Sequence, residues 1–292
     1  MRVTFSKGDA IRFIGHLDVV RLWERALRRA RLPLAYTKGF TPHPRLAFAA
    51  PLALGATAGA DLLDLYLSEP VTPAALIEAL NHALPPACRA VAASAVPLDG
   101  PSLMALMRWS AYQVQAVSPG AGGEDLPAES QGSRWAGRDT GGGLTAEAVG
   151  AGTDGAEPWR PPEERLAPRP PAKALPAAPA VRRRIDRLLA ASSLTWQRRR
   201  EGRATTVDLR PLILSLRLDG RRGGALRLTM VLRTDSGGSA RPDEVCAALG
   251  LRALRIHRQQ IGLNGEAPLA QVAAVGHRDD GGDGLPGQRR AL

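Results

Sequence analysis

The 292-residue sequence has only two cysteines, three lysines and few aromatic residues, which make up 4% of the chain. Cys88 and Cys246 are isolated, with no CxxC or CxxxCxxC spacing around either. The chain therefore supplies neither a disulfide framework nor the grouped ligands of an iron–sulfur cluster or a structural zinc. We expect no metal and no cofactor in this chain.

Long apolar runs are also absent, because no stretch reaches the roughly 18 residues that a membrane-spanning helix needs. The opening residues, MRVTFSKGDAIRF, lack the basic and then apolar layout of a secretory signal. We expect a cytoplasmic protein without membrane contact.

Acidic residues are the minority, since 39 Lys and Arg stand against 28 Asp and Glu for a net charge of +11. The excess is concentrated in residues 175–261, which hold 18 basic and 7 acidic residues. A GC-rich genome, which favours Ala, Gly and Arg codons, explains the preference for arginine over lysine but not this net excess. The charge favours an anionic partner, most simply nucleic acid.

Two segments have the composition of disordered chain. Residues 119–174 contain 11 Gly and 8 Pro with little hydrophobic periodicity, and residues 262–292 end in DDGGDGLPGQRRAL. We interpret the first as a disordered insertion and the second as a disordered tail. The predicted domains are then residues 1–108, and residues 109–118 together with 175–261.

The first domain follows a strand, helix, strand, strand, helix, strand order. We expect a strand at 2–5 that resumes at 12–14 and a helix at 15–31. Strands should follow at 34–37, 45–54 and 60–69, then a helix that Thr72 and Pro73 begin, and a last strand at 88–98. This order is typical of a ferredoxin-like (βαββαβ) sandwich, with both helices on one face of the sheet.

The second domain repeats that order. Strands are expected at 110–117, 212–218, 225–233 and 254–263, and helices at 181–192 and 241–250. The predicted fold class is therefore α+β, as two tandem ferredoxin-like sandwiches with the insertion inside the second copy.

His16 is placed at the start of the first helix. Gly15 occupies the cap position and Asp18 the third helical position, where a carboxylate suits the helix dipole, so Asp18 is interpreted as a capping residue. The helix N-terminus disfavours a charged imidazole and leaves His16 able to act as a base, a ligand or a hydrogen-bond donor. Arginines recur on the side opposite the apolar stripe, either as a solvated face or as an anion-binding one. They are Arg21, Arg25, Arg28 and Arg29.

The segment KGFTPHPR, residues 38–45, contains a second histidine, His43. In the predicted topology this loop lies at the same end of the sheet as His16, so Lys38, Phe40, His43 and Arg45 should share an edge with it. Pro42 and Pro44 stiffen the loop, and Phe40 is either presented to bases and phosphates or tucked into the core.

The hairpin of the second domain should place its even-numbered apolar residues, from Leu212 to Leu232, on the helix-covered face. Arg217, Arg227 and Arg233 then project from the open face, joined by Arg255 and His257 if the last strand has the matching register. The face lacks paired surface aromatics, so contact with the RNA backbone is the expected mode. His82 and His257 are otherwise assigned structural roles.

The run KGDAIRFIGHLDVVRLWERALRRARLPLAYTKGFTPHPRLAFAAPLALG, with TTVDLRPLI and RPDEVCAALGL further on, resembles the radical-SAM-linked domain family of unknown function. Members of that family are fused to, or encoded beside, a radical SAM protein with a cobalamin-binding-type domain. The resemblance implies a radical SAM protein as partner, with the iron–sulfur cluster and S-adenosylmethionine on that partner. Gly15 and the segment 59–62 depart from the family pattern, at the helix cap and at a usual glutamate.

Three functions remain open. The leading hypothesis is a non-catalytic accessory protein that binds RNA, either tRNA or rRNA, and presents it to a separate radical SAM enzyme. The second is a metal-independent ribonuclease with His16 and His43 as general base and acid and Arg45 or Lys38 as the phosphorane-stabilising cation. The third is a protein-interaction scaffold that binds no RNA.

Overall fold

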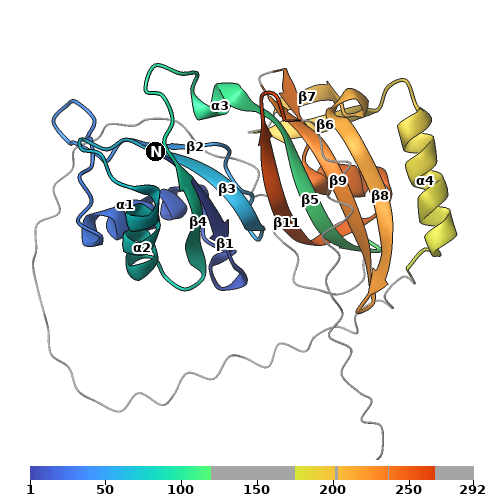
Figure 1. Ribbon diagram of the computed structural model, residues 1–292. Coiled ribbons are helices and arrows are strands. Elements are labelled where there is room, and N and C mark those ends of the chain that lie inside the picture. The colour runs from blue at the N-terminus through green and yellow to red at the C-terminus, as the bar shows by residue number, and fades with distance from the viewer. Residues whose placement is uncertain (120–174, 201–202, 236, 267–292) are drawn as a thin grey trace, which may run out of the picture.

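The structure, a computed structural model, describes residues 1–119, 175–200, 203–235 and 237–266. The chain is a mixed α/β protein with few helices, built on one nine-stranded and mostly antiparallel sheet (Figure 1). The predicted insertion lies outside the described residues apart from Pro119, as does most of the predicted tail.

The first half has the predicted βαββαβ order of its main elements, but residues 12–14, where the first strand was expected to resume, form no strand. The elements are β1 (Arg2–Lys7), the short 3-10 helix η1 (Asp9–Ile11), α1 (His16–Arg29), β2 (Leu46–Phe48), β3 (Thr57–Leu65), α2 (Pro73–Ala83) and β4 (Cys88–Ser94). Its strands lie in the order β2-β3-β1-β4. Both helices pack on one face of these strands, through Trp23 and Leu27 of α1 and Leu76 and Leu80 of α2, all fully buried.

Local chemistry sets the start of α2 as the sequence predicted. The Thr72 hydroxyl accepts a hydrogen bond from the Ala75 amide at 3.3 Å, and Pro73 takes the first position of α2. Gly15 is the N-cap of α1, in extended conformation and without a side-chain cap bond. Asp18, predicted to be a capping residue, forms an ion pair with Arg21 at 3.3 Å and no capping box with Gly15. α1 ends at Arg29, two residues earlier than predicted.

The strand predicted at residues 34–37 is wrong. This segment makes only two isolated bridges, Leu34 to Leu67 and Tyr36 to Pro44, and the next strand, β2, begins at Leu46. Residues 38–42 are thus the tip of a loop that connects α1 to β2. They do not connect two central strands of the sheet. This loop follows the C-terminal end of α1, whereas His16 lies at the N-terminal end of that helix. The prediction that both lie at one end of the sheet is therefore wrong.

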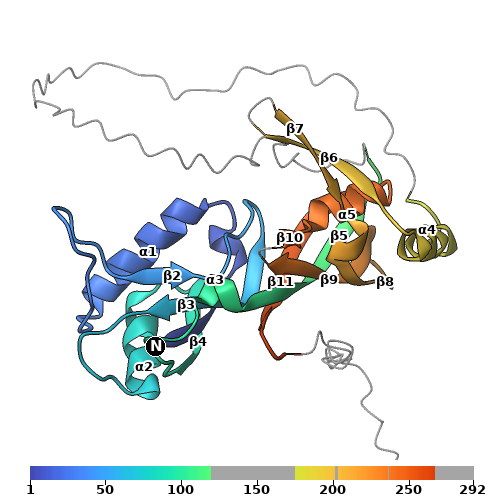
Figure 2. The ribbon, with the colours of Figure 1, turned by 90° about the horizontal axis from the view of Figure 1, so that it is seen from above.

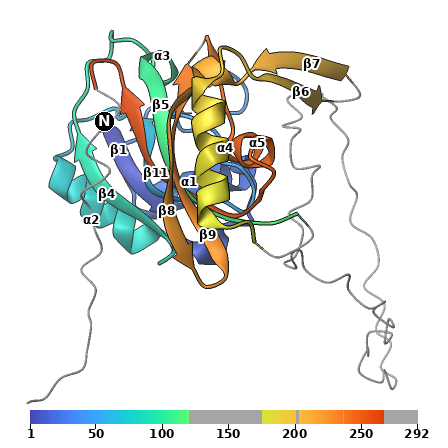
Figure 3. The ribbon, with the colours of Figure 1, turned by 90° about the vertical axis from the view of Figure 1, so that its right-hand side faces the viewer.

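The second half contains more elements than predicted. They are α3 (Leu103–Leu106), β5 (Met107–Val117), α4 (Ala178–Ala190), β6 (Thr195–Arg200), β7 (Arg203–Asp208), η2 (Arg210–Leu212), β8 (Ile213–Arg222), β9 (Ala225–Asp235), β10 (Gly238–Ser239), α5 (Pro242–Ala248) and β11 (Arg252–Leu263). Its main strands lie in the order β8-β9-β5-β11, and α4 lies across β8 (Figure 3). Val181 and Ile185 of α4 join Leu216 and Leu228 in its buried core.

The hairpin of β6 and β7 was not predicted. The sequence does contain strand-favouring residues in both segments, Trp196 in the first and Val207 in the second. The hairpin projects from the end of the second half (Figures 2 and 3). Arg198 anchors it to α5 through two bonds to the buried Glu244 carboxylate, at 2.6 and 2.7 Å.

Two further expectations for this half are corrected. Leu214 is 45% exposed rather than buried, because a bulge between Ile213 and Ser215 shifts the alternation of β8. Residues 262 and 263 were assigned both to the last strand, at 254–263, and to the tail. They are the end of β11, which pairs with Met107 at Leu263, so the strand assignment is confirmed and the tail assignment is wrong for these two residues.

β11 joins the two halves, because it pairs with β5 on one side and, in parallel, with β3 on the other. Directly paired residues point to the same face of a sheet. Lys7 pairs with Ala58, Ala58 with Arg258, and Arg258 with Tyr112, and all four are buried. The helix-covered face of the first half therefore continues into that of the second (Figure 2).

Candidate functional site

The two residue pairs that join β3 to β11 place polar side chains on both faces of the sheet. Arg258 and His257 are neighbours in β11, so their side chains point to opposite faces. Arg258 lies on the helix-covered face, between the two cores, and His257 lies on the other face.

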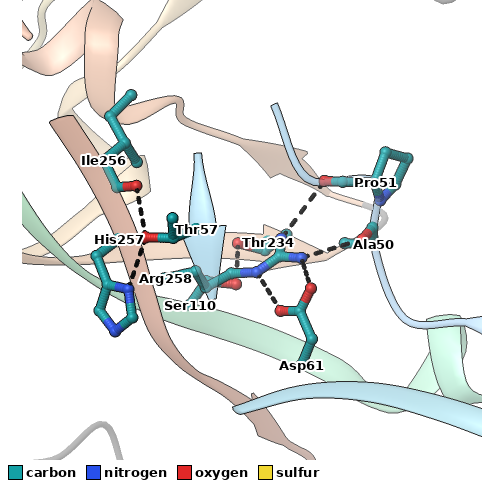
Figure 4. A network of polar contacts seen from close by, with 9 residues as sticks. All are labelled: Ala50, Pro51, Thr57, Asp61, Ser110, Thr234, Ile256, His257 and Arg258. Carbon is teal, nitrogen blue, oxygen red and sulfur yellow. Dashed lines mark hydrogen bonds and ion pairs between the residues drawn. The ribbon is translucent and has the colours of Figure 1, made fainter. Parts of the chain in front are cut away.

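Arg258 is the centre of a buried polar network (Figure 4). Only 2% of its surface is exposed, and its guanidinium donates to both oxygens of Asp61, at 2.6 and 2.7 Å. It also donates to the carbonyls of Ala50 at 3.1 Å and Pro51 at 3.4 Å. Burial alone would lower the pKa of Arg258, but the Asp61 charge and the hydrogen bonds raise it above its usual range.

Lys7 and His16 lie beside this ion pair. The Lys7 ammonium donates to the carbonyls of Arg12 at 3.1 Å and Ile14 at 3.3 Å, and burial lowers its pKa. Burial likewise lowers the pKa of His16, and the positive charges of Arg258 and Lys7 lower it further. His16 is half-buried, so its neutral form is favoured as predicted, with burial as the leading cause.

The structure does not bring His16 and His43 together. The His16 ring packs edge-on against Phe48, with 5.5 Å between ring centroids, whereas His43 Nδ1 lies 3.5 Å from the Glu24 carboxylate. His16 and Glu24 are eight residues apart on α1, which is about 12 Å along the helix axis. The two rings are thus held at different places along α1 and do not converge on one reacting group.

The loop between α1 and β2 presents its side chains to solvent. Phe40 and Lys38 are both exposed at the tip, so of the two alternatives left open for Phe40 the structure shows the ring presented to solvent and not tucked into the core. Arg45 lies over the Tyr66 ring, with its Cζ 4.2 Å from the ring centroid. His43 is also exposed, and its amide donates to the Thr37 hydroxyl at 3.0 Å.

The predicted arginines of α1 are all exposed. Arg21 pairs with Asp18 at 3.3 Å, and Arg28 donates to the Glu24 carbonyl at 3.2 Å. They lie on the outside of α1, which packs on the helix-covered face. A basic surface here is therefore on the other side of the sheet from Arg217, Arg227 and Arg233.

Polar side chains form two transverse rows on the face of the second half that no described helix covers, which we call the open face. One row crosses five strands and consists of Thr57, His257, Gln113, Thr229 and Arg217. The next row consists of Arg255, Gln115 and Arg227. The register of β11 meets the condition stated for Arg255 and His257, so both residues lie on the open face.

Several arginines of the open face are tied to nearby carboxylates. Arg217 pairs with Asp219 at 2.8 Å, and Arg233 pairs with Asp235 at 2.7 Å. Among the described residues, no acidic side chain forms an ion pair with Arg227. These contacts fix the guanidinium groups in position, while the open face keeps more guanidinium than carboxylate groups.

The open face is hollowed beside β11 by a polar cavity of about 180 Å³, which we call the seam pocket. The first half lines it with Asp9, Arg12, Gly55 and Thr57, and the second half with Gln113, Gln115, Arg255 and His257. The Thr57 hydroxyl lies 2.9 Å from His257 Nδ1, and burial lowers the pKa of that imidazole. Of this pocket, the sequence predicted only Arg255 and His257 as members of one face.

The two cysteines lie away from the seam pocket and are buried. Burial raises the pKa of both Cys88 and Cys246 to about 12, so neither thiol is activated as a nucleophile. In the part of the chain that the structure describes, no three His, Cys, Asp or Glu side chains are grouped to hold a metal ion. The site is equipped to bind through hydrogen bonds and positive charge.

Residues 1–242 match a protein family described as an uncharacterized protein conserved in bacteria (DUF2344). No curated protein matches the chain. No helix within the described ranges combines the length and the apolar character that a membrane crossing requires.

Proposed function

We propose that this chain, which belongs to the DUF2344 family of bacterial proteins, binds RNA along the open face and acts as a non-catalytic accessory protein. The observation that carries the proposal is the pair of polar rows, which places Arg217 of β8, Arg227 of β9 and Arg255 of β11 on one face of the sheet with no described helix above them. Guanidinium groups are suited to the phosphates of a nucleic-acid backbone.

Backbone contact is favoured over base stacking on this face. Trp109 is the one aromatic side chain among its described residues, and it is 2% exposed, because it lies flat over Gly262. Stacking of bases needs accessible rings, as in single-strand binding proteins. We therefore propose recognition through phosphates and riboses, with affinity that falls steeply as salt rises.

The geometry favours binding over cleavage. A ribonuclease that used His16 and His43 would need both rings at one phosphate, and they are held by Phe48 and Glu24 at separate places along α1. The partner in our proposal is a separate radical SAM enzyme, to which the chain would present tRNA or rRNA. That part rests on the resemblance of residues 7–55 to radical-SAM-linked proteins.

We also propose that each half is a copy of one ferredoxin-like sandwich. The orders β4-β1-β3-β2 and β11-β5-β9-β8 become identical when the main strands are numbered within each half. The hairpin of β6 and β7 is then an addition to the second copy.

The experiment compares two variants that remove the same charge from opposite sides of the sheet. Arg217→Gln/Arg227→Gln changes the open face, and Arg21→Gln/Arg25→Gln changes α1. Binding of a fluorescently labelled structured RNA is measured by anisotropy over a range of salt concentrations. We expect the open-face variant to bind more weakly and the slope of log affinity against log salt to fall by about 1.8, as for two lost phosphate contacts.

The α1 variant serves as the matched control and should keep the wild-type slope. Equal losses of RNA affinity in the two variants would mean that RNA binds through the overall positive charge and not through the open face. Wild-type protein that binds no RNA in dilute buffer would refute RNA binding. Co-purification with the radical SAM enzyme that survives nuclease treatment, without any RNA affinity, would identify a protein-interaction scaffold instead.

A further inference from the structure

The seam pocket is built by both halves of the chain and lies directly beside the two residue pairs that join them. Thr57 and Gly55 come from the first half, and His257 and Arg255 from the second. A group bound there contacts residues about 200 positions apart in the sequence, as the Thr57 to His257 contact already does. Sites between two structural units are common places for ligands.

The pocket carries one net positive charge. Arg12 and Arg255 contribute two guanidinium groups, Asp9 contributes one carboxylate, and the neutral form of His257 is favoured by burial. An RNA phosphodiester carries one negative charge, so it matches this balance. A second phosphate charge would have no counterpart in the pocket.

Hydrogen-bond donors in the pocket outnumber the contacts that occupy them. Asp9 lies 3.1 Å from one terminal nitrogen of Arg12 and 3.6 Å from one terminal nitrogen of Arg255. Each guanidinium has five N–H donors, so both keep donors for a ligand. The side-chain amides of Gln113 and Gln115 add uncharged donors on the opposite wall.

The wall around Arg12 is rigid before any ligand binds. The Arg12 carbonyl accepts from the Lys7 ammonium at 3.1 Å and from the Gly55 amide at 2.9 Å. Gly55 has a φ of 79°, a conformation that glycine adopts without strain. A pre-organised site loses little conformational freedom on binding, which favours affinity.

The size of the pocket argues for one group of a larger molecule. Its volume of about 180 Å³ holds about six water molecules at their share of liquid volume. Pockets for whole small-molecule ligands are usually about 300–1,000 Å³. A phosphate with its two ester oxygens fits the smaller space, and the chain on either side can continue over the open face.

We propose that the seam pocket holds a single phosphodiester of the RNA backbone, which fixes the register of the RNA on the open face. This inference rests on the proposed function and makes it more specific. Arg227 lies two strands from Arg255 through Gln115, about 10 Å away, so the RNA runs from the pocket across the sheet toward β8.

The probes are uridylyl-(3′→5′)-uridine, which contains one phosphodiester, uridine, which contains none, and inorganic phosphate. Dissociation constants come from NMR shift titrations of the full-length protein. We expect the dinucleotide to bind more tightly than uridine or inorganic phosphate. Arg255→Gln should weaken it by at least about tenfold, because a charge-assisted contact is lost.

Arg217→Gln is the matched control, because it removes the same charge three strands away on the same face. It should leave dinucleotide binding within about twofold and weaken only the longer RNA. Gln115→Glu is a second variant of nearly identical shape that adds a carboxylate to the pocket, and it should abolish binding. The dispersion of the NMR spectrum confirms that each variant is folded.

Equal binding of uridine and the dinucleotide would overturn the proposal, as would inorganic phosphate binding without the dinucleotide, which would indicate a site for a free anion. Dinucleotide binding that Arg255→Gln leaves unchanged would refute the pocket, while the open face still stands if Arg217→Gln/Arg227→Gln weakens the longer RNA. If only the pocket variants matter, the pocket stands and the extended RNA surface does not.

Discussion

Arg258 offers a direct test of how the two halves are held together. In Arg258→Met the guanidinium is lost and an apolar stem of similar length remains. The carboxylate of Asp61, which is 5% exposed, then stays buried without the partner that contacts both of its oxygens. Removing one member of a buried ion pair costs about 3–5 kcal/mol.

The double variant Arg258→Met/Asp61→Leu separates the charge from the other contacts. With both charges gone, the remaining cost comes from the Ala50 and Pro51 carbonyls, which lose the donor that reached them at 3.1 and 3.4 Å. A buried acceptor without a partner costs about 1–3 kcal/mol. The double variant should therefore be no less stable than Arg258→Met, and the coupling energy should be at least about 2 kcal/mol.

Urea unfolding followed by circular dichroism measures these differences, provided that the m-value is unchanged. Arg217→Met is the control, because its ion pair with Asp219 at 2.8 Å is about half exposed and should contribute no more than about 1 kcal/mol. If Arg258→Met costs less than about 1 kcal/mol, or if the losses in Arg258→Met and in the single variant Asp61→Leu simply add in the double variant, the buried pair does not stabilise this junction as argued.

Two other predictions concern packing and pH. Gly262→Ala would place a Cβ 1.9 Å from the Trp109 ring, so we expect the free energy of unfolding to fall by about 1–3 kcal/mol and tryptophan fluorescence to shift to the red. The control is Gly100→Ala, whose Cβ would have its nearest atom 3.5 Å away. It should change the free energy of unfolding by less than about 0.5 kcal/mol in the same urea titration. Because the folded-state pKa of His16 lies below its ordinary value of 6.5, the unfolded state binds more protons as the pH falls below 6.5, and stability should decline there. His16→Asn should make that decline less steep; a slope equal to that of the wild type in unfolding experiments between pH 7 and pH 5 would contradict the assignment.

Features that depend on neighbouring residues were predictable. Thr72 and Pro73 mark the start of α2 because the cap hydroxyl and the fixed proline φ act within one helical turn. The alternation of Leu226, Leu228 and Met230 predicted the buried face of β9 because side chains in a strand change sides at every residue.

Features that depend on distant pairing were not predictable in the same way. The bulge that exposes Leu214 and the isolated bridges at Leu34 and Tyr36 depend on which segment of the chain lies alongside. The local sequence does not indicate the identity of that neighbouring segment. The placement of the His43 loop failed for this reason, since a misassigned strand moved it to the wrong end of α1. One feature of the buried polar network could have been found from the sequence. Lys7 follows Val3 and Phe5 at the same two-residue spacing, so the pattern places a charged side chain on the buried face of β1.

The sequence by itself determined the order of the main helices and strands in each half, the basic excess of the second half and the alternation along most of these strands. Only the tertiary structure decided what each arginine does. Arg255 and Arg258 are three residues apart on β11, yet the first lines an open cavity with half of its side chain exposed and the second is buried against Asp61. The strands that flank β11, and the register in which they pair, place each side chain in solvent or between the two cores, and contacts across some 200 residues set that register.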